Sequence, residues 1–286
     1  MNKLLTAIIH KRKIFTLIIV IIFIAILSKT VNELGVNYLA NQQERKDGIM
    51  IGAEPLFLQR GNEVGILLIH GFTSSPGDFS KLANFLAEKN ITVYAPLLPG
   101  HGTHPRDLKS INHQDWINSA QQALNLLNTK KKFVLGYSMG GTLALTLAAE
   151  NDLNGVISIN SAIFLANRYV AFIPLLKLVE TYTAKKSEDI IKFIDEKRVV
   201  YDSTPLESIT ELQELINTVQ LQKITEPILI FQADNDKIIL PESADYIYSN
   251  VNSEDKILIS LANSTHSKIN NQDETFSRLY KFILAH

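Results

Sequence analysis

The sequence has no cysteine among its 286 residues. Disulfide bonds and thiolate metal sites are therefore excluded. A chain without thiols is compatible with the reducing and with the oxidising side of a membrane. No internal repeat is visible, and positive charge is not in excess, since 28 Lys and Arg residues oppose 29 Asp and Glu residues. Five of these bases and none of the acids lie in residues 1–30, which leaves 23 bases against 29 acids elsewhere. This excess of acidic residues outside residues 1–30 disfavours binding of a polyanion, so no nucleic acid partner is expected.

One long hydrophobic run is present near the N-terminus. Ile14–Leu27 is almost entirely apolar, with basic residues on both sides at Lys11–Lys13 and Lys29. This run is short for spanning ~30 Å of hydrocarbon and also has the length of a signal-peptide core. The flanking lysines can extend to the membrane surface, however, and Ile26–Lys29 is a poor signal-peptidase site. We therefore expect residues 1–30 to be an uncleaved membrane anchor, with a cleaved signal peptide as the alternative.

The charges around this run also predict its orientation. Because the basic cluster precedes the run, the positive-inside rule puts Met1 in the cytoplasm. The rest of the chain would then lie outside the cytoplasm, on the periplasmic side in a Gram-negative cell. Residues 31–48 are polar and are expected to be an irregular linker, and residues 49–286 to form one large domain.

Within that domain, short apolar runs alternate with helical patterns. Continuous apolar runs of this length are typical of strands buried on both faces of a parallel sheet, and the helical patterns between them predict crossovers. The expected fold class is therefore α/β, with a doubly wound, mostly parallel sheet. The predicted strands are Val64–Ile69, Ile91–Ala95, Phe133–Tyr137, Gly155–Ile159, Pro227–Phe231 and Lys256–Ser260.

The alternation is interrupted over about residues 161–221. A structureless loop of that length is unusual, so we expect a small, mainly helical cap inserted after the strand that ends at Ile159. Its apolar residues, Phe164, Phe172 and Leu176 among them, would either form the cap's own core or line an acyl pocket beneath a lid.

Ser138 is the strongest candidate for a reactive side chain. It is the central residue of a G-x-S-x-G pattern (Gly136 to Gly140) that follows a predicted strand and precedes an Ala- and Leu-rich helical stretch. A strand, a sharp glycine-flanked turn and a helix are the context of a nucleophile elbow, which exposes the serine at the carboxyl end of the strand. The alternative is an ordinary strand-to-helix turn whose serine has no chemical role.

A serine nucleophile needs a base, and the base needs an orienting carboxylate. Only two of the seven histidines follow the insertion, and His286 is the last residue, so His266, after the last predicted strand, is the expected base. Asp234 and Asp236 both follow the strand before it. We prefer Asp236 because it lies further into the loop, while Asp234 is better placed to stabilise the turn.

The negative oxygen formed by attack on a carbonyl needs two hydrogen-bond donors. The expected donors are the N–H groups of Met139, directly after the serine, and of Phe72, in the loop after the first strand of the sheet. His70 and His101 are interpreted as structural. No histidine cluster has metal-ligand spacing, so neither a metal nor a cofactor is expected.

Five ordered motifs between residues 60 and 286 resemble the bacterial carboxylesterase and monoacylglycerol lipase group of the α/β-hydrolase superfamily. They read HGFTSSP, LLPGHGTHPRDL, GYSMGG, QADNDKIILPESADYIY and STH. The resemblance implies the α/β-hydrolase fold with a small cap. It also implies activity on esters of medium or long acyl chains, with nucleophile, acid and base at Ser138, Asp236 and His266. Most soluble members of the group lack the apolar N-terminal run.

The expected function is thus hydrolysis of a small ester or lipid through an acyl-enzyme. Alternatives are a prolyl aminopeptidase-like amide hydrolase, for which the cap acids Glu188, Asp189 and Glu196 could bind a peptide amine, and an acyltransferase. A non-catalytic, membrane-tethered binding module is a further alternative, which labelling by a fluorophosphonate probe would separate from a working serine hydrolase. The sequence does not predict the oligomeric state.

Overall fold

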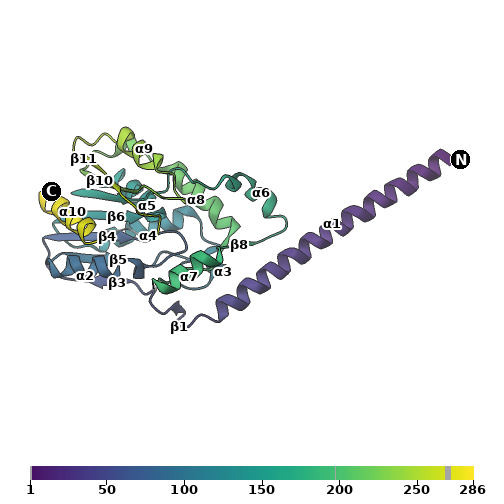
Figure 1. The fold of residues 1–286 in the computed structure, drawn as a ribbon, viewed down its shortest axis with the longest axis horizontal. Coiled ribbons are helices and arrows are strands. Elements are labelled where there is room, and N and C mark those ends of the chain that lie inside the picture. The colour runs from purple at the N-terminus through teal and green to yellow at the C-terminus, as the bar shows by residue number, and fades with distance from the viewer. Residues whose placement is uncertain (1, 197, 268–271) are drawn as a thin grey trace.

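The computed structural model describes residues 2–196, 198–267 and 272–286. Its centre is a seven-stranded sheet in which each strand pairs in parallel with its neighbours, except for the antiparallel edge strand β3 (Figure 1). The α/β class and the mostly parallel sheet predicted from the sequence are confirmed. In spatial order the strands are β11 (Lys256–Leu261), β10 (Ile228–Ala233), β7 (Gly155–Ile159), β6 (Lys131–Tyr137), β4 (Val64–Ile69), β5 (Thr92–Ala95) and β3 (Leu56–Leu58).

Helices cover both faces of this sheet, because successive side chains of a strand point to opposite faces. In β4, Leu67 and Ile69 belong to one buried cluster, and Ile66 and Leu68 belong to a second. The first cluster includes residues of α4 (His113–Leu126), α5 (Met139–Ala148), α8 (Leu206–Thr218) and α9 (Glu242–Asn250). The second includes residues of α2 (Ser80–Glu88) and α10 (Gln272–Ala285). Short elements complete this body, namely β1 (Arg45–Lys46), β2 (Ile49–Met50), η1 (Pro76–Phe79), α3 (Pro105–Leu108) and η3 (Leu221–Lys223).

Between β7 and α8 the chain leaves the sheet and forms an inserted segment, residues 161–205. It differs from the expected cap in two ways. It contains an antiparallel strand pair beside its helices. In addition, α8 lies within the range expected for the cap but buries Leu212 and Leu215 in the core beside the sheet. The elements of the inserted segment are η2 (Arg168–Phe172), α6 (Ile173–Leu176), β8 (Tyr182–Ala184), α7 (Ser187–Asp195) and β9 (Ser203–Pro205).

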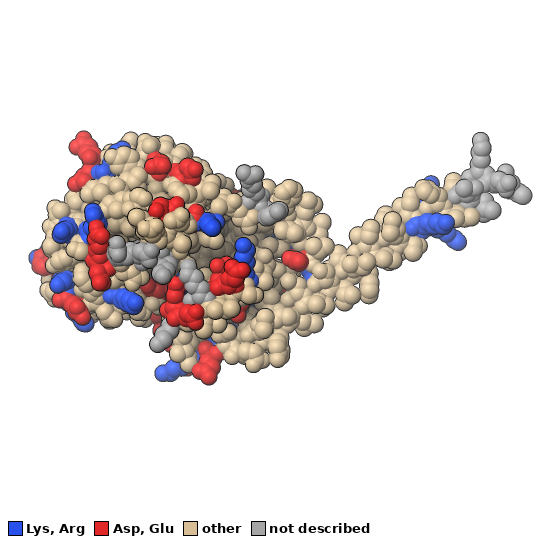
Figure 2. Space-filling view, viewed as in Figure 1, with Lys and Arg blue, Asp and Glu red and all other residues tan. Residues whose placement is uncertain are grey.

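The N-terminal helix α1 runs without a break from Asn2 to Asn41 and extends away from the body (Figure 1). By length and composition alone, it is long and apolar enough to cross a membrane. Its basic residues near the N-terminal end are separated from the body by an uncharged stretch (Figure 2). The prediction that residues 31–48 are an irregular linker is wrong for 31–41, which form the last three turns of this helix.

These last turns stay helical because they pack on the body rather than standing in solvent. The Asn32 side chain binds the main chain of Thr181 and Tyr182, and Glu33 forms an ion pair of 3.0 Å with Lys109. Arg45 then caps the helix end by donating to the carbonyls of Ala40 and Gln43. Polar side chains that looked like those of a solvated linker in the sequence therefore make tertiary contacts.

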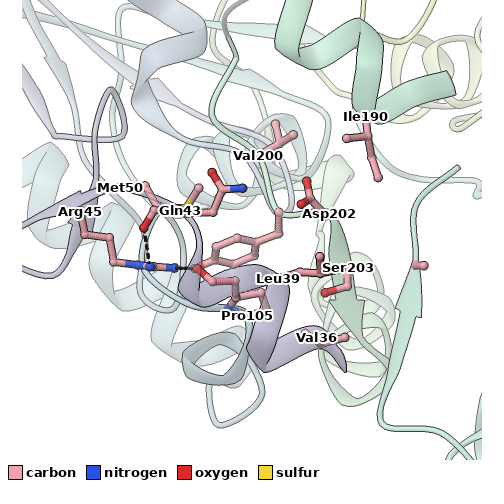
Figure 3. A pocket seen from close by; sticks show the side chains of 13 residues that line it. Val36, Leu39, Gln43, Arg45, Met50, Pro105, Ile190, Val200, Asp202 and Ser203 are labelled. Atoms are coloured by element: carbon pink, nitrogen blue, oxygen red, sulfur yellow. Dashed lines mark hydrogen bonds between the residues drawn. The ribbon is translucent and has the colours of Figure 1, made fainter. Parts of the chain in front are cut away.

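A cavity of about 300 Å³ lies between the end of α1 and the inserted segment (Figure 3). Apolar side chains dominate its lining, and Arg45 and Asp202 contribute charged groups. Representative apolar lining residues are Val36, Leu39, Met50, Ile190 and Val200.

Candidate functional site

Ser138 is at the apex of the turn that joins β6 to α5. Its backbone has φ of 56° and ψ of −120°, a conformation that residues other than glycine rarely adopt. The turn is tight enough that a Cβ on Gly140 would lie 1.9 Å from the carbonyl oxygen of Ile69. Gly140 is therefore required for close packing of α5 against β4, as a nucleophile elbow demands.

The serine, histidine and aspartate singled out from the sequence come together at the carboxyl edge of the sheet. Ser138 Oγ lies 3.0 Å from His266 Nε2, and His266 Nδ1 lies 2.7 Å from Asp236 Oδ2. The Asp236 side chain is fully buried, and 16% of the His266 side chain is exposed. In such an arrangement a histidine can accept the proton of the serine while the carboxylate orients and stabilises the ring.

The two aspartates of the loop after β10 have separate partners. The second carboxylate oxygen of Asp236 accepts hydrogen bonds from the N–H groups of Ile238 and Ile239, at 2.8 and 2.9 Å. Asp234 is exposed and instead accepts from the N–H groups of Asn263 and Ser264, in the turn that leads to His266. The structure therefore joins Asp236 to the histidine ring and joins Asp234 to the loop that carries it.

The loop after β4 passes directly beside the serine. A Cβ on Gly71 would lie 3.3 Å from the Cβ of Ser138, and Phe72 is the next residue of this loop. The Gly71 carbonyl accepts hydrogen bonds from Ser74 N–H and from the His70 ring. Because the C=O and N–H of a trans peptide point in opposite directions, these bonds also orient the Phe72 N–H. The Met139 N–H is among those at the start of α5 that lack an acceptor within the helix.

His70 and His101 are buried in the loops behind the serine. The His70 ring bridges two of these loops, since Nδ1 bonds the Gly71 carbonyl at 2.9 Å and Nε2 accepts from the Leu98 N–H at 3.1 Å. Burial lowers the pKa of His70 to about 4. Burial, with His70 close by, also lowers the pKa of His101. The geometry of both rings agrees with the structural interpretation made from the sequence.

Two residues that the sequence did not single out hold the backbone of His266. The Tyr137 hydroxyl and the Asn160 side-chain amide both donate to the His266 carbonyl oxygen. Burial raises the pKa of Tyr137 well above its ordinary value, so this hydroxyl remains a donor. Tyr137 precedes the serine and Asn160 follows β7, but only the folded chain brings them to residue 266. No sequence pattern indicated this contact.

The sequence matches one family model and several known proteins. Residues 62–273 match the family described as serine aminopeptidase, S33. The chain is 33% identical over 245 residues to the thermostable monoacylglycerol lipase of Bacillus sp. (strain H-257), covering 83% of this chain and 97% of that relative. It is 28% identical over 207 residues to a carboxylesterase of Bacillus subtilis (strain 168), covering 71% of this chain and 84% of the relative.

A solved structure has the same architecture. It was reported with LipS and LipT, two metagenome-derived lipolytic enzymes, and superimposes with a TM-score of 0.76 at 29% sequence identity. The match covers 83% of this chain and the whole of the other. The chain therefore belongs to the serine aminopeptidase S33 family of the α/β-hydrolase superfamily, within the group of bacterial carboxylesterases and monoacylglycerol lipases.

Proposed function

We propose that this protein is a serine hydrolase that cleaves carboxylic esters through an acyl-enzyme. The observation that carries the proposal is the unbroken hydrogen-bonded chain from Ser138 through His266 to the buried carboxylate of Asp236. The similarity to a monoacylglycerol lipase and a carboxylesterase supports an ester as the substrate. No cofactor is needed for this reaction.

The proposed reaction has two halves. His266 Nε2 takes the proton of Ser138 as its oxygen attacks the ester carbonyl, and Asp236 stabilises the positive ring. The Phe72 and Met139 N–H groups donate to the negative oxygen of the tetrahedral intermediate. The protonated ring then gives its proton to the leaving alcohol, and the acyl-enzyme remains. In the second half, His266 activates a water molecule that releases the carboxylic acid.

The test is Ser138→Ala, assayed on a short aryl ester with the full chain in detergent. We expect hydrolysis to fall at least ~10³-fold, because the nucleophile is removed while the fold is retained. Ser110→Ala, at an exposed position, is the matched control and should hydrolyse like the wild type. A fluorophosphonate probe should label the wild type and the control but not Ser138→Ala. Near-normal turnover by Ser138→Ala would refute the proposal.

We further propose that the substrate is an acyl ester of lipid type, such as a monoacylglycerol, and that the inserted segment caps its binding site. Part of the apolar surface of that segment is not its own core, because Phe172, Leu175 and Leu178 are 54%, 63% and 64% exposed. A series of glycerol and aryl esters of increasing acyl length measures this. Higher kcat/KM for medium or long chains than for acetyl esters supports a lipid, and a steady decline with length contradicts it.

The proposed location is a membrane, with α1 as the anchor and the body outside the cytoplasm. From Leu27, where the apolar run ends, to Val36, which lines the cavity on the body, the helix rises only about 14 Å. The body is therefore held close to the bilayer, and α6 lies on the side of the body from which α1 extends (Figure 1). This arrangement supports access to a substrate that resides in lipid.

Membrane extraction and protease accessibility test the anchor and its orientation. The full chain should stay with membranes in alkaline carbonate. In cells stripped of any outer envelope, added protease should degrade the body. A body that survives this treatment would contradict the proposed orientation, and release by carbonate would contradict the anchor. N-terminal sequencing of the membrane form distinguishes an uncleaved anchor from a processed signal peptide.

Amide hydrolysis is the second candidate, because the matching family is described as a serine aminopeptidase. Binding a peptide amine would need a converging acidic site in the inserted segment. Glu188 and Asp189 are instead exposed in the first turn of α7, and Glu196 lies 4.0 Å from Arg198. These positions favour the ester. Parallel assays on aryl esters and on matched aminoacyl amides separate the two activities.

A further inference from the structure

The inserted segment binds the loop after β4 at the residue that follows Phe72. Thr73 has φ of 61°, which is unfavourable for a β-branched residue. Two contacts from the inserted segment hold it in this conformation. The Lys185 ammonium donates to Thr73 Oγ1 at 2.7 Å, and the Tyr201 N–H donates to the Thr73 carbonyl at 2.9 Å. The strained conformation therefore depends on residues more than a hundred positions away in the chain.

Arg198 makes a second connection, between the inserted segment and η1, which follows the loop after β4. Its guanidinium binds both carboxylate oxygens of Asp78, at 2.8 and 2.6 Å, and its third nitrogen lies 3.5 Å from the carbonyl of Ser267. Burial opposes the charge, but the hydrogen bonds and charge of Asp78 outweigh it and raise the pKa of Arg198. Asp78 follows the Phe72 loop and Ser267 follows His266, so one side chain joins the loops that carry the proposed oxyanion donor and the proposed base.

Tyr201 connects the inserted segment to a third loop, the one after β5. Its hydroxyl donates to the Gly100 carbonyl at 2.8 Å and accepts from the Thr103 N–H at 2.9 Å. We propose that Lys185, Arg198 and Tyr201 form a brace that positions the oxyanion hole and the His266 loop, with Lys185 and Arg198 as positioning residues. The proposal rests on the function proposed above, in which Phe72 is an oxyanion donor.

The brace acts because a hydrogen bond to an oxyanion is sensitive to small displacements. Loss of one complete donor costs about 10²–10³-fold in kcat, so partial misalignment of the Phe72 loop should cost less. The inserted segment would also have to move if it is a lid that admits substrate. Release of Lys185 and Arg198 would then weaken the oxyanion hole, and reclosure would restore it. Chemistry would proceed only when the segment is docked.

The first test is Lys185→Met. Methionine keeps an apolar stem near the Phe193 ring but removes the ammonium, whose pKa burial and the neighbouring Arg198 lower to about 8. The variant loses a poorly solvated charge and also the donor to Thr73 Oγ1, so it should fold with a midpoint of thermal unfolding close to that of the wild type. We expect kcat on the short aryl ester to fall about tenfold with KM changed less than threefold. Lys186→Met, one residue on and exposed, is the matched control and should match the wild type.

The second test removes the buried ion pair without leaving a lone charge. The double variant Arg198→Met, Asp78→Leu should fold, since an apolar pair can replace a buried ion pair. We expect its kcat to fall at least tenfold, with a parallel fall in the rate of fluorophosphonate labelling. The single variant Arg198→Lys keeps a positive charge and should retain more activity than the double variant, though less than the wild type. A merely structural role would lower the unfolding temperature and leave kcat of the folded protein unchanged.

The brace is refuted if Lys185→Met and the double variant are both folded and both keep kcat within twofold of the wild type. Ser138→Ala is measured beside them on the same ester. If Ser138→Ala stays active, the proposed function fails. If Ser138→Ala is inactive and the brace variants are normal, only the brace fails.

Discussion

The Asn32 side chain, near the end of the apolar N-terminal helix, forms two hydrogen bonds with the main chain of Tyr182 in the inserted segment. Its Nδ2 donates to the Tyr182 carbonyl at 3.0 Å, and its Oδ1 accepts from the Tyr182 N–H at 2.8 Å and from the Thr181 N–H at 3.1 Å. The helix that we propose as the anchor is thus attached to β8, three residues before Lys185. Residues 31–41 are structurally part of the body.

Asn32→Ala should therefore destabilise the protein. The change leaves two backbone N–H groups and a carbonyl in a partly buried setting without their partners, which costs about 1–3 kcal/mol of unfolding free energy. Asn37→Ala is the matched control on the same helix, because among the described residues the buried Asn37 Oδ1 has no hydrogen-bond partner. Denaturant unfolding of both variants measures the difference. Equal stabilities would contradict the attachment.

Soluble fragments test the same attachment at larger scale. A fragment that begins at Val31 keeps the docked turns and should fold and hydrolyse the aryl ester. A fragment that begins at Gly48 loses them and exposes the apolar side chains that line the cavity beside α1. We expect the shorter fragment to unfold at lower temperature and to be less active. Full activity and stability of the shorter fragment would show that the turns are dispensable.

Substitution of the two aspartates after β10 should affect activity very differently. Asp236→Asn disrupts the carboxylate that orients His266 and should lower kcat about 10³–10⁴-fold. Asp234→Asn weakens the hydrogen bonds from the Asn263 and Ser264 N–H groups but leaves His266 with its carboxylate, so its kcat should stay within about tenfold of the wild type. Steady-state kinetics on the aryl ester decides. The reverse order of effects would assign the acid to Asp234.

Two glycines should respond oppositely to alanine. At Gly140 a Cβ would lie 1.9 Å from the Ile69 carbonyl oxygen, so Gly140→Ala must push α5 away from β4 and distort the turn at Ser138. We expect loss of activity and of several kcal/mol of stability, on the order of other overpacked cores. At Gly35, on the docked end of α1, no atom lies within 4 Å of such a Cβ. Gly35→Ala should stabilise the helix by about 0.5–1 kcal/mol, measured by denaturant unfolding.

Stability should fall as the pH drops below about 6.5. The pKa of His70 is lowered to about 4 by burial, so between these values the unfolded chain binds a proton that the folded protein excludes. The unfolding free energy therefore decreases with falling pH, by as much as ~3 kcal/mol near pH 4 from this group. His70→Gln should show a shallower decrease between pH 7 and pH 4. Parallel curves for the two proteins would contradict this assignment.

The sheet and the three residues that meet beside it could be predicted from local sequence patterns. Each buried strand is a short apolar run, and side chains at the carboxyl ends of parallel strands converge on one edge of the sheet. By that rule Ser138, Asp236 and His266, which lie in three separate loops, are expected to meet. The edge strand β3 was missed because Leu56–Leu58 is too short to show a periodicity.

The sequence by itself determined the parallel core, the tight turn at Ser138 and the presence of a long apolar N-terminal helix, since each follows from residues that are neighbours in the chain. Only the tertiary structure decided that polar residues such as Asn32 extend this helix onto the body. It also decided that Lys185 binds Thr73, that Arg198 binds Asp78, and that Tyr137 holds the backbone of His266. The physical reason is that a polar side chain carries no sequence signal for a distant partner. Its preference for solvent or for a buried hydrogen bond is settled by what the fold brings within about 3 Å.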